Sequence, residues 1–265
     1  MKEGSRTPSL QHGCLLLRAR PELVATAPPH TPVYRIGRGP SVFDPPPWEI
    51  ARDDGTFGGR FDDPAAQPGV ARSVVLPVEQ RFRIIYCATD RAGAYGESIA
   101  RFRDSISLLA LTERVEDGSP KTSHLHGVIP SDWRLQRRLG RTQLEPSLRC
   151  VDLGAVATLT HLRNSLAGVA SDLGLSDIDL GTVVGPQRRF TQEAARYIYE
   201  LTDDDGMPEY AGIRYVSRLN SGWECWAIFH DRMLHTTFPN ESIFPNDAGL
   251  FEAARVLGLV LPEAS

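Results

Sequence analysis

A strand signal that runs directly into a helix signal constrains the fold of this chain more than any other feature. The segment 82–87, Phe-Arg-Ile-Ile-Tyr-Cys, is rich in β-branched and aromatic residues, which is typical of a buried strand. Thr89 or Asp90 can cap a helix after it by accepting a hydrogen bond from a free backbone N–H of the first turn. Apolar residues then recur at three- and four-residue spacing, at Ala92, Tyr95, Ile99, Phe102, Ile106 and Leu109. We therefore expect a strand followed at once by an amphipathic stretch of one or more helices.

Further strands and helices are interspersed along the chain without a regular strand–helix–strand rhythm. Strands are expected at residues 33–37, 148–153, 212–219 and 224–230, with a hairpin turn at 220–222. Helices are expected at residues 132–139, 156–173, 191–201 and 250–257. A chain of 265 residues can bury a sizeable core. This order of elements favours a mixed α+β domain.

The first part of the chain differs in composition from the rest. Residues 1–32 are expected to form a weakly structured N-terminal extension. Its last eight residues, Ala-Thr-Ala-Pro-Pro-His-Thr-Pro, have the composition of a linker, since prolines remove backbone donors and block helices. Residues 33–265 then form the main domain.

Charge and cysteine content indicate the compartment and the classes of partner. The formal net charge is −4, so the chain has no global attraction to nucleic acid or to an anionic membrane. Arg134, Arg137, Arg138 and Arg141 form the only dense basic run, which favours a solvated helix face over an anion site. The four cysteines are far apart and no membrane-spanning or secretory segment is evident. We expect reduced thiols in a cytoplasmic protein.

Arg60 and Glu97 are candidate ligand-binding residues. Arg60 follows two glycines, which let the backbone turn tightly, and its guanidinium suits a phosphate; an unpaired surface arginine is the alternative. Glu97 lies off the apolar helix stripe, close to Gly93 and Gly96. Because each glycine costs a helix roughly 1 kcal/mol relative to alanine, the pair suggests a bare patch against which something packs. A solvated glutamate at an irregular helix start is the alternative.

Two further candidates lie on strands. The ring of Tyr86, near a strand end, can stack on a flat ligand ring, or it can be a core tyrosine with a satisfied hydroxyl. Ser217 is expected either to bond to the backbone or to point at a ligand. No Gly-x-Ser-x-Gly motif surrounds it, so we do not expect a nucleophile. His124 and His126 have no third ligand near them in sequence, so no metal site is expected.

The order of these residues resembles the RES-domain toxin family, whose name refers to an arginine, a glutamate and a serine. The matching elements span roughly residues 33–232: Gly-Arg-Phe at 59–61, the strand with Tyr86, Glu97 on the next helix, and Gly-Ile-x-Tyr-x-Ser at 212–217. An early Tyr34-Arg35 strand motif and the segment 190–195 are also in keeping with the family.

The resemblance implies a fold and an activity. The fold would be that of ADP-ribosyltransferase toxins, a split and curved β core with helices around a NAD cleft. The activity would be cleavage of NAD at the nicotinamide–ribose bond by water or inorganic phosphate, with no metal or resident cofactor. Family members usually pair with a helix-turn-helix (Xre-type) antitoxin protein, which covers the active site.

The resemblance also implies roles for single residues. Glu97 would stabilise the charge that develops on the ribose or hold a ribose hydroxyl, and Arg60 would clamp the pyrophosphate or bind attacking phosphate. Tyr86 would position the nicotinamide or its ribose, and Ser217 would donate to the ribose or the amide. Tyr34 and Arg35 are further candidates for the cleft.

The chain also departs from compact family members. Arg60 and Tyr86 are 26 residues apart, and residues 103–146 resemble an insertion. An ADP-ribosyltransferase that modifies a macromolecule and a non-catalytic interaction module on the same fold are alternative functions. The sequence leaves the oligomeric state open, a homo-oligomer included.

Overall fold

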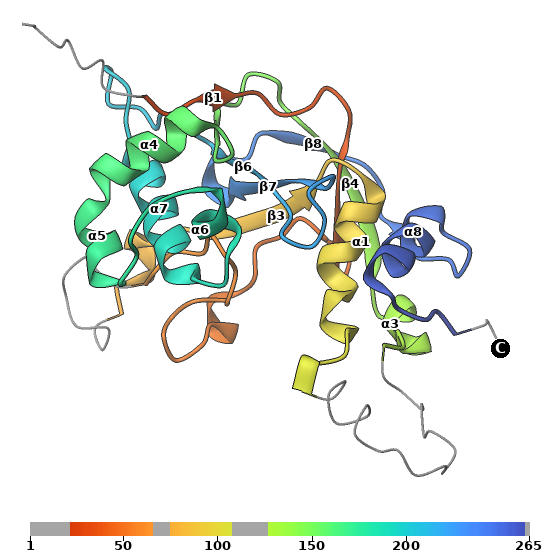
Figure 1. The fold of residues 1–265 in the computed structure, drawn as a ribbon. Coiled ribbons are helices and arrows are strands. Elements are labelled where there is room, and N and C mark those ends of the chain that lie inside the picture. The colour runs from red at the N-terminus through yellow and green to blue at the C-terminus, as the bar shows by residue number, and fades with distance from the viewer. Residues whose placement is uncertain (1–21, 66–74, 108–126, 263–265) are drawn as a thin grey trace, which may run out of the picture.

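The computed structural model describes residues 22–65, 75–107 and 127–262, and its strands form one nine-stranded sheet (Figure 1). The strand order is β1-β5-β6-β7-β3-β2-β4-β8, and β9 pairs with β4. The strands are β1 (Ala25–Thr26), β2 (Val33–Gly37), β3 (Ile84–Ala88), β4 (Arg138–Leu144), β5 (Cys150–Asp152), β6 (Gly212–Val216), β7 (Glu224–Phe229), β8 (His235–Thr237) and β9 (Glu241–Ser242). Only β5 and β6 pair in parallel, and the other described pairs are antiparallel.

Helices cover the sheet in two groups, which Figure 1 separates clearly. The described α-helices are α1 (Arg91–Ile99), α3 (Ser131–Leu135), α4 (Val156–Ser165), α5 (Ala167–Asp172), α6 (Leu180–Val184), α7 (Arg188–Glu200) and α8 (Ala248–Leu257). Short 3-10 turns lie at Trp48–Ile50, Val78–Gln80, Ala100–Phe102 and His230–Arg232. Helices α4 to α7 lie at one end of the sheet, and α1, α3 and α8 lie at the other. The prediction of an α+β fold with helices around a curved β core is confirmed.

The sheet divides between β2 and β3. These two strands share a single pair, Tyr34 with Ala88, although β2 pairs along its whole length with β4 and β3 pairs along its whole length with β7. Beyond the shared pair, the edges of β2 and β3 that face each other are unpaired. Backbone N–H and C=O groups require partners, so this split leaves polar backbone available to a ligand.

Each side of the split has its own hydrophobic core. Phe190 and Ile198 of α7 pack with Ile213 and Phe229 of the sheet. On the other side, the core that α1 and α8 share also contains Trp133 and Trp223; its fully buried members include Tyr95, Ile99, Leu250 and Ala253. A third cluster joins the two sides, because Val33 of β2 packs with Ile85 of β3 and Trp226 of β7.

The strand-to-helix prediction is confirmed, with a shorter helix than the apolar stripe allowed. The Asp90 side chain caps α1 by accepting from the Gly93 N–H at 2.6 Å. Ala92, Tyr95 and Ile99 are buried, as the spacing requires. Ile106 is 85% exposed, and Leu109 lies outside the described residues. The stripe therefore ends with the 3-10 turn that follows α1.

The helix expected at 132–139 is present only as far as Leu135, and the prediction that the whole basic run lies on a solvated helix face was wrong. Helix α3 ends at Leu135, and β4 begins at Arg138 and pairs with β2. Arg137 is buried, with its guanidinium over the Trp133 ring at 5.1 Å. Burial of Leu139 and Leu144 in the sheet outweighed the helical character of the basic run. Thus part of segment 103–146 belongs to the sheet, while residues 108–126, with His124 and His126, lie outside the described residues.

Two other boundaries differ from expectation. The helix expected at 156–173 is broken at Leu166, whose backbone (φ −113°, ψ 24°) is not helical. Near the N-terminus, β1 pairs with β5, and the Val24 N–H donates to Thr158 Oγ at 3.0 Å. The end of the expected N-terminal extension is therefore held at the edge of the sheet.

The hairpin, the other strands and the last helix follow the sequence pattern closely. The turn between β6 and β7 is closed by the Gly222 N–H, which donates to Asn220 Oδ1 at 2.9 Å. Cys87, Cys150 and Cys225 are free and buried. Within the described ranges, no helix combines the length and apolar character needed to cross a membrane.

Candidate active site

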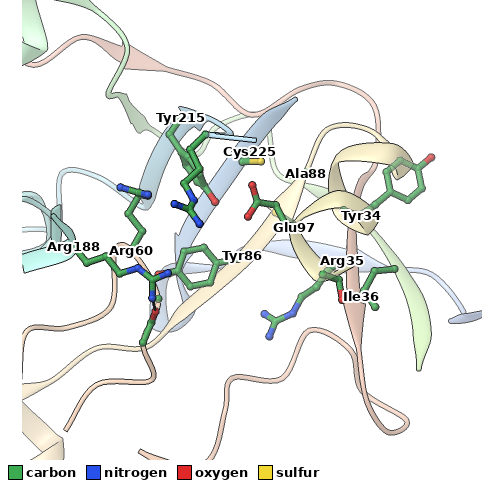
Figure 2. Close-up of a pocket in the computed structure, with 16 residues that line it drawn as sticks. Tyr34, Arg35, Ile36, Arg60, Tyr86, Ala88, Glu97, Arg188, Tyr215 and Cys225 are labelled. Carbon is green, nitrogen blue, oxygen red and sulfur yellow. Dashed lines mark hydrogen bonds between the residues drawn. The ribbon is translucent and has the colours of Figure 1, made fainter. Parts of the chain in front are cut away.

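A cleft of about 350 Å³ opens where β2 and β3 part (Figure 2). Its volume lies in the range of small-molecule sites, roughly 300–1,000 Å³. Residues from β2, β3, α1, the 58–60 loop, the start of α7 and the β6–β7 hairpin line it. Five of the six residues singled out from the sequence are among them: Tyr34, Arg35, Arg60, Tyr86 and Glu97. The fold thus brings together side chains from distant parts of the chain.

Glu97 and Ser217 form a pair. The Ser217 hydroxyl donates to Glu97 Oε1 at 2.5 Å and accepts from the Leu219 N–H at 3.0 Å. Glu97 is exposed at the cleft, whereas Ser217 is 3% exposed and is absent from the cleft lining. Ser217 therefore lies behind the carboxylate and fixes its orientation, and its hydroxyl is already engaged. Glu97 presents its other oxygen to the cleft.

The glycines beside Glu97 are explained by packing against Trp223. A Cβ atom on Gly96 would lie 2.1 Å from the Trp223 ring, and one on Gly93 would lie 3.4 Å from Trp223 Cβ. The bare patch that the sequence suggested is therefore occupied by a side chain of the same domain. Trp223 is 3% exposed, so α1 is pressed closely onto the hairpin that also carries Ser217.

Gly96→Ala is expected to destabilise the protein by about 1–3 kcal/mol, because the added methyl overpacks a buried ring. Urea unfolding of wild type and variant measures the change. Gly168→Ala is the matched control: Gly168 also lies in a helix, but nothing lies within 4 Å of its added Cβ. That control should be neutral or slightly stabilising. Equal stability of the two variants would contradict the packing assigned to Trp223.

Tyr86 anchors the loop that carries Arg60. Its hydroxyl donates to Asp62 Oδ1 at 2.9 Å and accepts from the Phe61 N–H at 2.9 Å. Asp62 Oδ2 accepts from the Gly59 N–H at 2.5 Å. Burial raises the pKa of Tyr86 well above its ordinary value, and the neighbouring Asp62 carboxylate adds to this. Tyr86 thus remains a neutral phenol whose hydroxyl is satisfied, while the residue lines the cleft.

The loop needs a glycine for this close approach. A Cβ atom on Gly59 would lie 2.4 Å from the Tyr86 hydroxyl and 2.3 Å from Asp62 Oδ1. Gly58 has a φ of +82°, in the left-handed region that favours glycine. The Gly-Gly-Arg sequence therefore reflects a turn that packs on Tyr86 and holds Arg60 at the cleft.

Arg60 is held at the cleft by the chain before α7. Its Nη1 donates to the carbonyl oxygens of Val183 at 2.9 Å and Gly185 at 2.7 Å. Burial lowers the pKa of Arg60, and the nearby charges of Arg218 and Arg188 lower it further. Arg60 is therefore not an isolated surface arginine.

Tyr34 and Arg35 lie on the opposite side of the cleft, on β2. The Tyr34 ring points away from Glu97 (Figure 2), and the Arg91 guanidinium lies 5.8 Å from its centre. Burial lowers the pKa of Arg35, whose Nη1 is buried without a hydrogen-bond partner in the described part of the chain. Arg35 therefore has an unused donor, whereas the Tyr34 ring is directed elsewhere.

A family model, described as RES domain, matches residues 32–243. The chain belongs to the RES-domain family. The match includes every residue that lines the cleft, and helix α8 lies beyond its end. Neither the curated proteins nor the solved structures gave a match. The RES-domain family is associated with NAD-related toxins.

In this RES domain, the cleft residues that were not among the sequence candidates include Arg188, Tyr215 and Arg218. Tyr215 belongs to the Gly-Ile-x-Tyr-x-Ser segment and Arg218 directly follows Ser217, so proximity in sequence offered a signal for both. Arg188 is the first residue of α7, 128 positions after Arg60, and had no such signal.

The cleft of the RES domain is also lined by two cysteines, Cys87 and Cys225. Burial raises the pKa of both thiols, so they stay protonated and are poor nucleophiles. Across the described ranges, no group of three or more His, Cys, Asp and Glu side chains is placed to hold a metal ion. The exposed carboxylate of Glu97 is the acidic group that the cleft offers to a substrate.

Proposed function

We propose that this RES domain cleaves NAD at the bond between nicotinamide and ribose. The observation that supports the proposal is the position of Glu97: a carboxylate oriented by a serine hydroxyl, in a cleft that four arginines also line. A dinucleotide carries negative charge on its diphosphate and develops positive charge at the reacting ribose. The cleft offers groups of opposite sign for each.

The chemistry requires a single well-placed carboxylate. When the C1′–N bond breaks, its electron pair moves to the nicotinamide nitrogen, and the ribose gains oxocarbenium character. The Glu97 carboxylate stabilises that positive charge, because a fixed anion does not have to reorganise during the reaction. Water or phosphate then forms a bond to C1′ through oxygen, and with water a proton is released to solvent. Nicotinamide leaves as a neutral molecule, so no general acid is needed.

The remaining residues would bind the substrate. Arg60 would hold the diphosphate, since a guanidinium offers a planar set of donors to phosphate oxygens. The Tyr86 ring would pack on the nicotinamide or its ribose. Ser217 would act through Glu97, and not by direct contact with NAD, because its hydroxyl is committed to the carboxylate.

We further propose that the protein is the toxin of a type II toxin–antitoxin pair, with a helix-turn-helix (Xre-type) protein as its antitoxin. The family association supports the toxin role. Glu97, Arg188 and Arg218 are exposed, so a partner that covers the cleft would reach the reactive carboxylate directly.

Incubation of the purified protein with NAD, with and without inorganic phosphate, tests the proposed function. Free ADP-ribose identifies hydrolysis, and ADP-ribose 1″-phosphate identifies phosphorolysis. Radiolabel transferred from NAD to an added protein or nucleic acid would identify the alternative, an ADP-ribosyltransferase. If NAD is unchanged under all these conditions, the proposal is wrong.

Ser217→Ala is expected to lower kcat for NAD about 10- to 100-fold and leave KM nearly unchanged. The reason is that a hydrogen bond to a charged group is worth about 1.5–3 kcal/mol, and each 1.36 kcal/mol is about tenfold in rate. Steady-state kinetics separates kcat from KM. Ser221→Ala, in the exposed hairpin turn, is the control. A rise in KM with kcat unchanged would instead assign Ser217 to substrate binding.

A further inference from the structure

The cleft has a charge opposite to that of the whole chain. The chain has a formal net charge of −4, whereas the cleft is lined by four arginines and one glutamate. Asp62, a carboxylate hydrogen-bonded to two cleft residues, is 4% exposed and accepts from Tyr86, Gly59 and Phe57. Local charge of this kind concentrates an anionic ligand at the cleft.

Three of the arginines lie together. Figure 2 shows Arg60 and Arg188 on one side of Tyr86 and Glu97, with Arg35 on the other side. Arg218 follows Ser217 directly, and its charge acts on Arg60 together with that of Arg188. We call Arg60, Arg188 and Arg218 the arginine wall.

The arginine wall keeps most of its donors unused. Arg60 donates through Nη1 to two carbonyls, and Arg188 donates through Nη1 to the Gly58 carbonyl. Arg218 is exposed and has no hydrogen bond or ion pair with any described residue. Arg188 and Arg218 both repel Arg60, and none of the three forms an ion pair with a described residue, so an anion with several oxygens that binds between them stabilises all three.

We propose that the arginine wall binds the diphosphate of the substrate, and that Arg188 and Arg218 make the enzyme selective for dinucleotides over nicotinamide nucleosides. The proposal rests on the proposed NAD cleavage and adds Arg188 and Arg218 as residues that determine specificity. Arg60 is fixed by two carbonyls and sets the position of the phosphates. Arg188 and Arg218 come from separate elements and supply positive charge that attracts the diphosphate. A nucleoside has no phosphate, so this charge does not strengthen its binding.

The test compares NAD with nicotinamide riboside, which has the same glycosidic bond and no phosphate. Relative to wild type, Arg188→Ala and Arg218→Ala should each lower kcat/KM for NAD about tenfold or more. They should change kcat/KM for the riboside less than about twofold. Arg255→Ala, an exposed arginine on α8 outside the cleft, is the matched control and should change neither value. The wild-type preference for NAD should also fall as salt concentration rises, since salt screens exposed charges.

Binding of ADP-ribose, measured by calorimetry, separates this proposal from the proposed function. Weaker binding in both arginine variants, with Arg255→Ala unchanged, supports the wall whether or not NAD is cleaved. If NAD is cleaved and the Arg188→Ala, Arg218→Ala double variant keeps the wild-type preference for NAD over riboside, the role proposed for the arginine wall is wrong. The proposed function is then still supported. Unchanged ADP-ribose affinity in the double variant would also show that the role proposed for the arginine wall is wrong.

Discussion

Glu97→Gln is expected to lower kcat for NAD cleavage by about 10²- to 10³-fold. Removal of one preorganised group that stabilises transition-state charge has an effect of this size in other enzymes. Glutamine keeps the shape of the side chain and can still accept from Ser217, so the variant removes the negative charge at the cleft and little else. Product formation under saturating NAD measures the loss.

The control for this prediction is Glu252→Gln on α8, which is exposed and lies outside the cleft. It should retain wild-type kcat. Because Glu97 is itself exposed, its glutamine variant should unfold at a denaturant concentration close to that of wild type. If a folded Glu97→Gln variant kept wild-type turnover, the Glu97 carboxylate would have no part in the mechanism.

Asp63→Ala is expected to lower the free energy of unfolding by about 3–5 kcal/mol, the largest effect on stability that we foresee. Asp63 is 2% exposed and pairs with Arg196 at 2.6 Å and with Arg81 at 3.7 Å. It also accepts from the N–H groups of Phe82 and Ala65, at 3.2 and 2.7 Å. Loss of one partner of a buried ion pair leaves the other charge buried without compensation. Equilibrium unfolding in urea measures the change.

Asp177→Ala is the control for Asp63. Asp177 also pairs with an arginine, Arg163 at 3.0 Å, but both side chains are more than half exposed. An exposed pair contributes at most about 1 kcal/mol, so this variant should be close to wild type. Similar losses in the two variants would mean that burial does not govern the Asp63 network. A functional loss should accompany the loss of stability, because residues 59–63 also carry Arg60.

Local sequence patterns predicted the elements that depend on near neighbours. The β-branched segment before Asp90 gave β3, the Asp90 carboxylate capped α1, and the Asn220 turn closed the β6–β7 hairpin. Each of these depends on contacts within a few residues. The helix predicted for the basic run is too long for the complementary reason: Arg138 and Arg141 lie in β4, whose conformation is set by pairing with β2, about 100 residues earlier in the chain.

The sequence identified the candidate residues, and the structure shows contacts that give some of them a different role. The glycines next to Glu97 indicated a patch against which something packs, and only the structure shows that this group is Trp223. Ser217 was assigned to substrate, but its hydroxyl holds Glu97. Sequence spacing cannot show either contact, because each joins segments more than 100 residues apart and depends on how α1 packs on the β6–β7 hairpin.

The sequence by itself determined that this chain is an α+β protein of the RES-domain family, with an arginine, a tyrosine, a glutamate and a serine in a defined order. Residue periodicity, helix caps and turns depend on near neighbours in the sequence, so they can be recognised without knowledge of the fold. Only the tertiary structure decided what those residues face. The split between β2 and β3 creates the cleft, Ser217 lies behind Glu97, and Arg188 reaches Arg60 from the start of α7. The physical reason is that burial, ion pairing and the repulsion between the arginines depend on distance in space, which the order of residues along the chain does not specify.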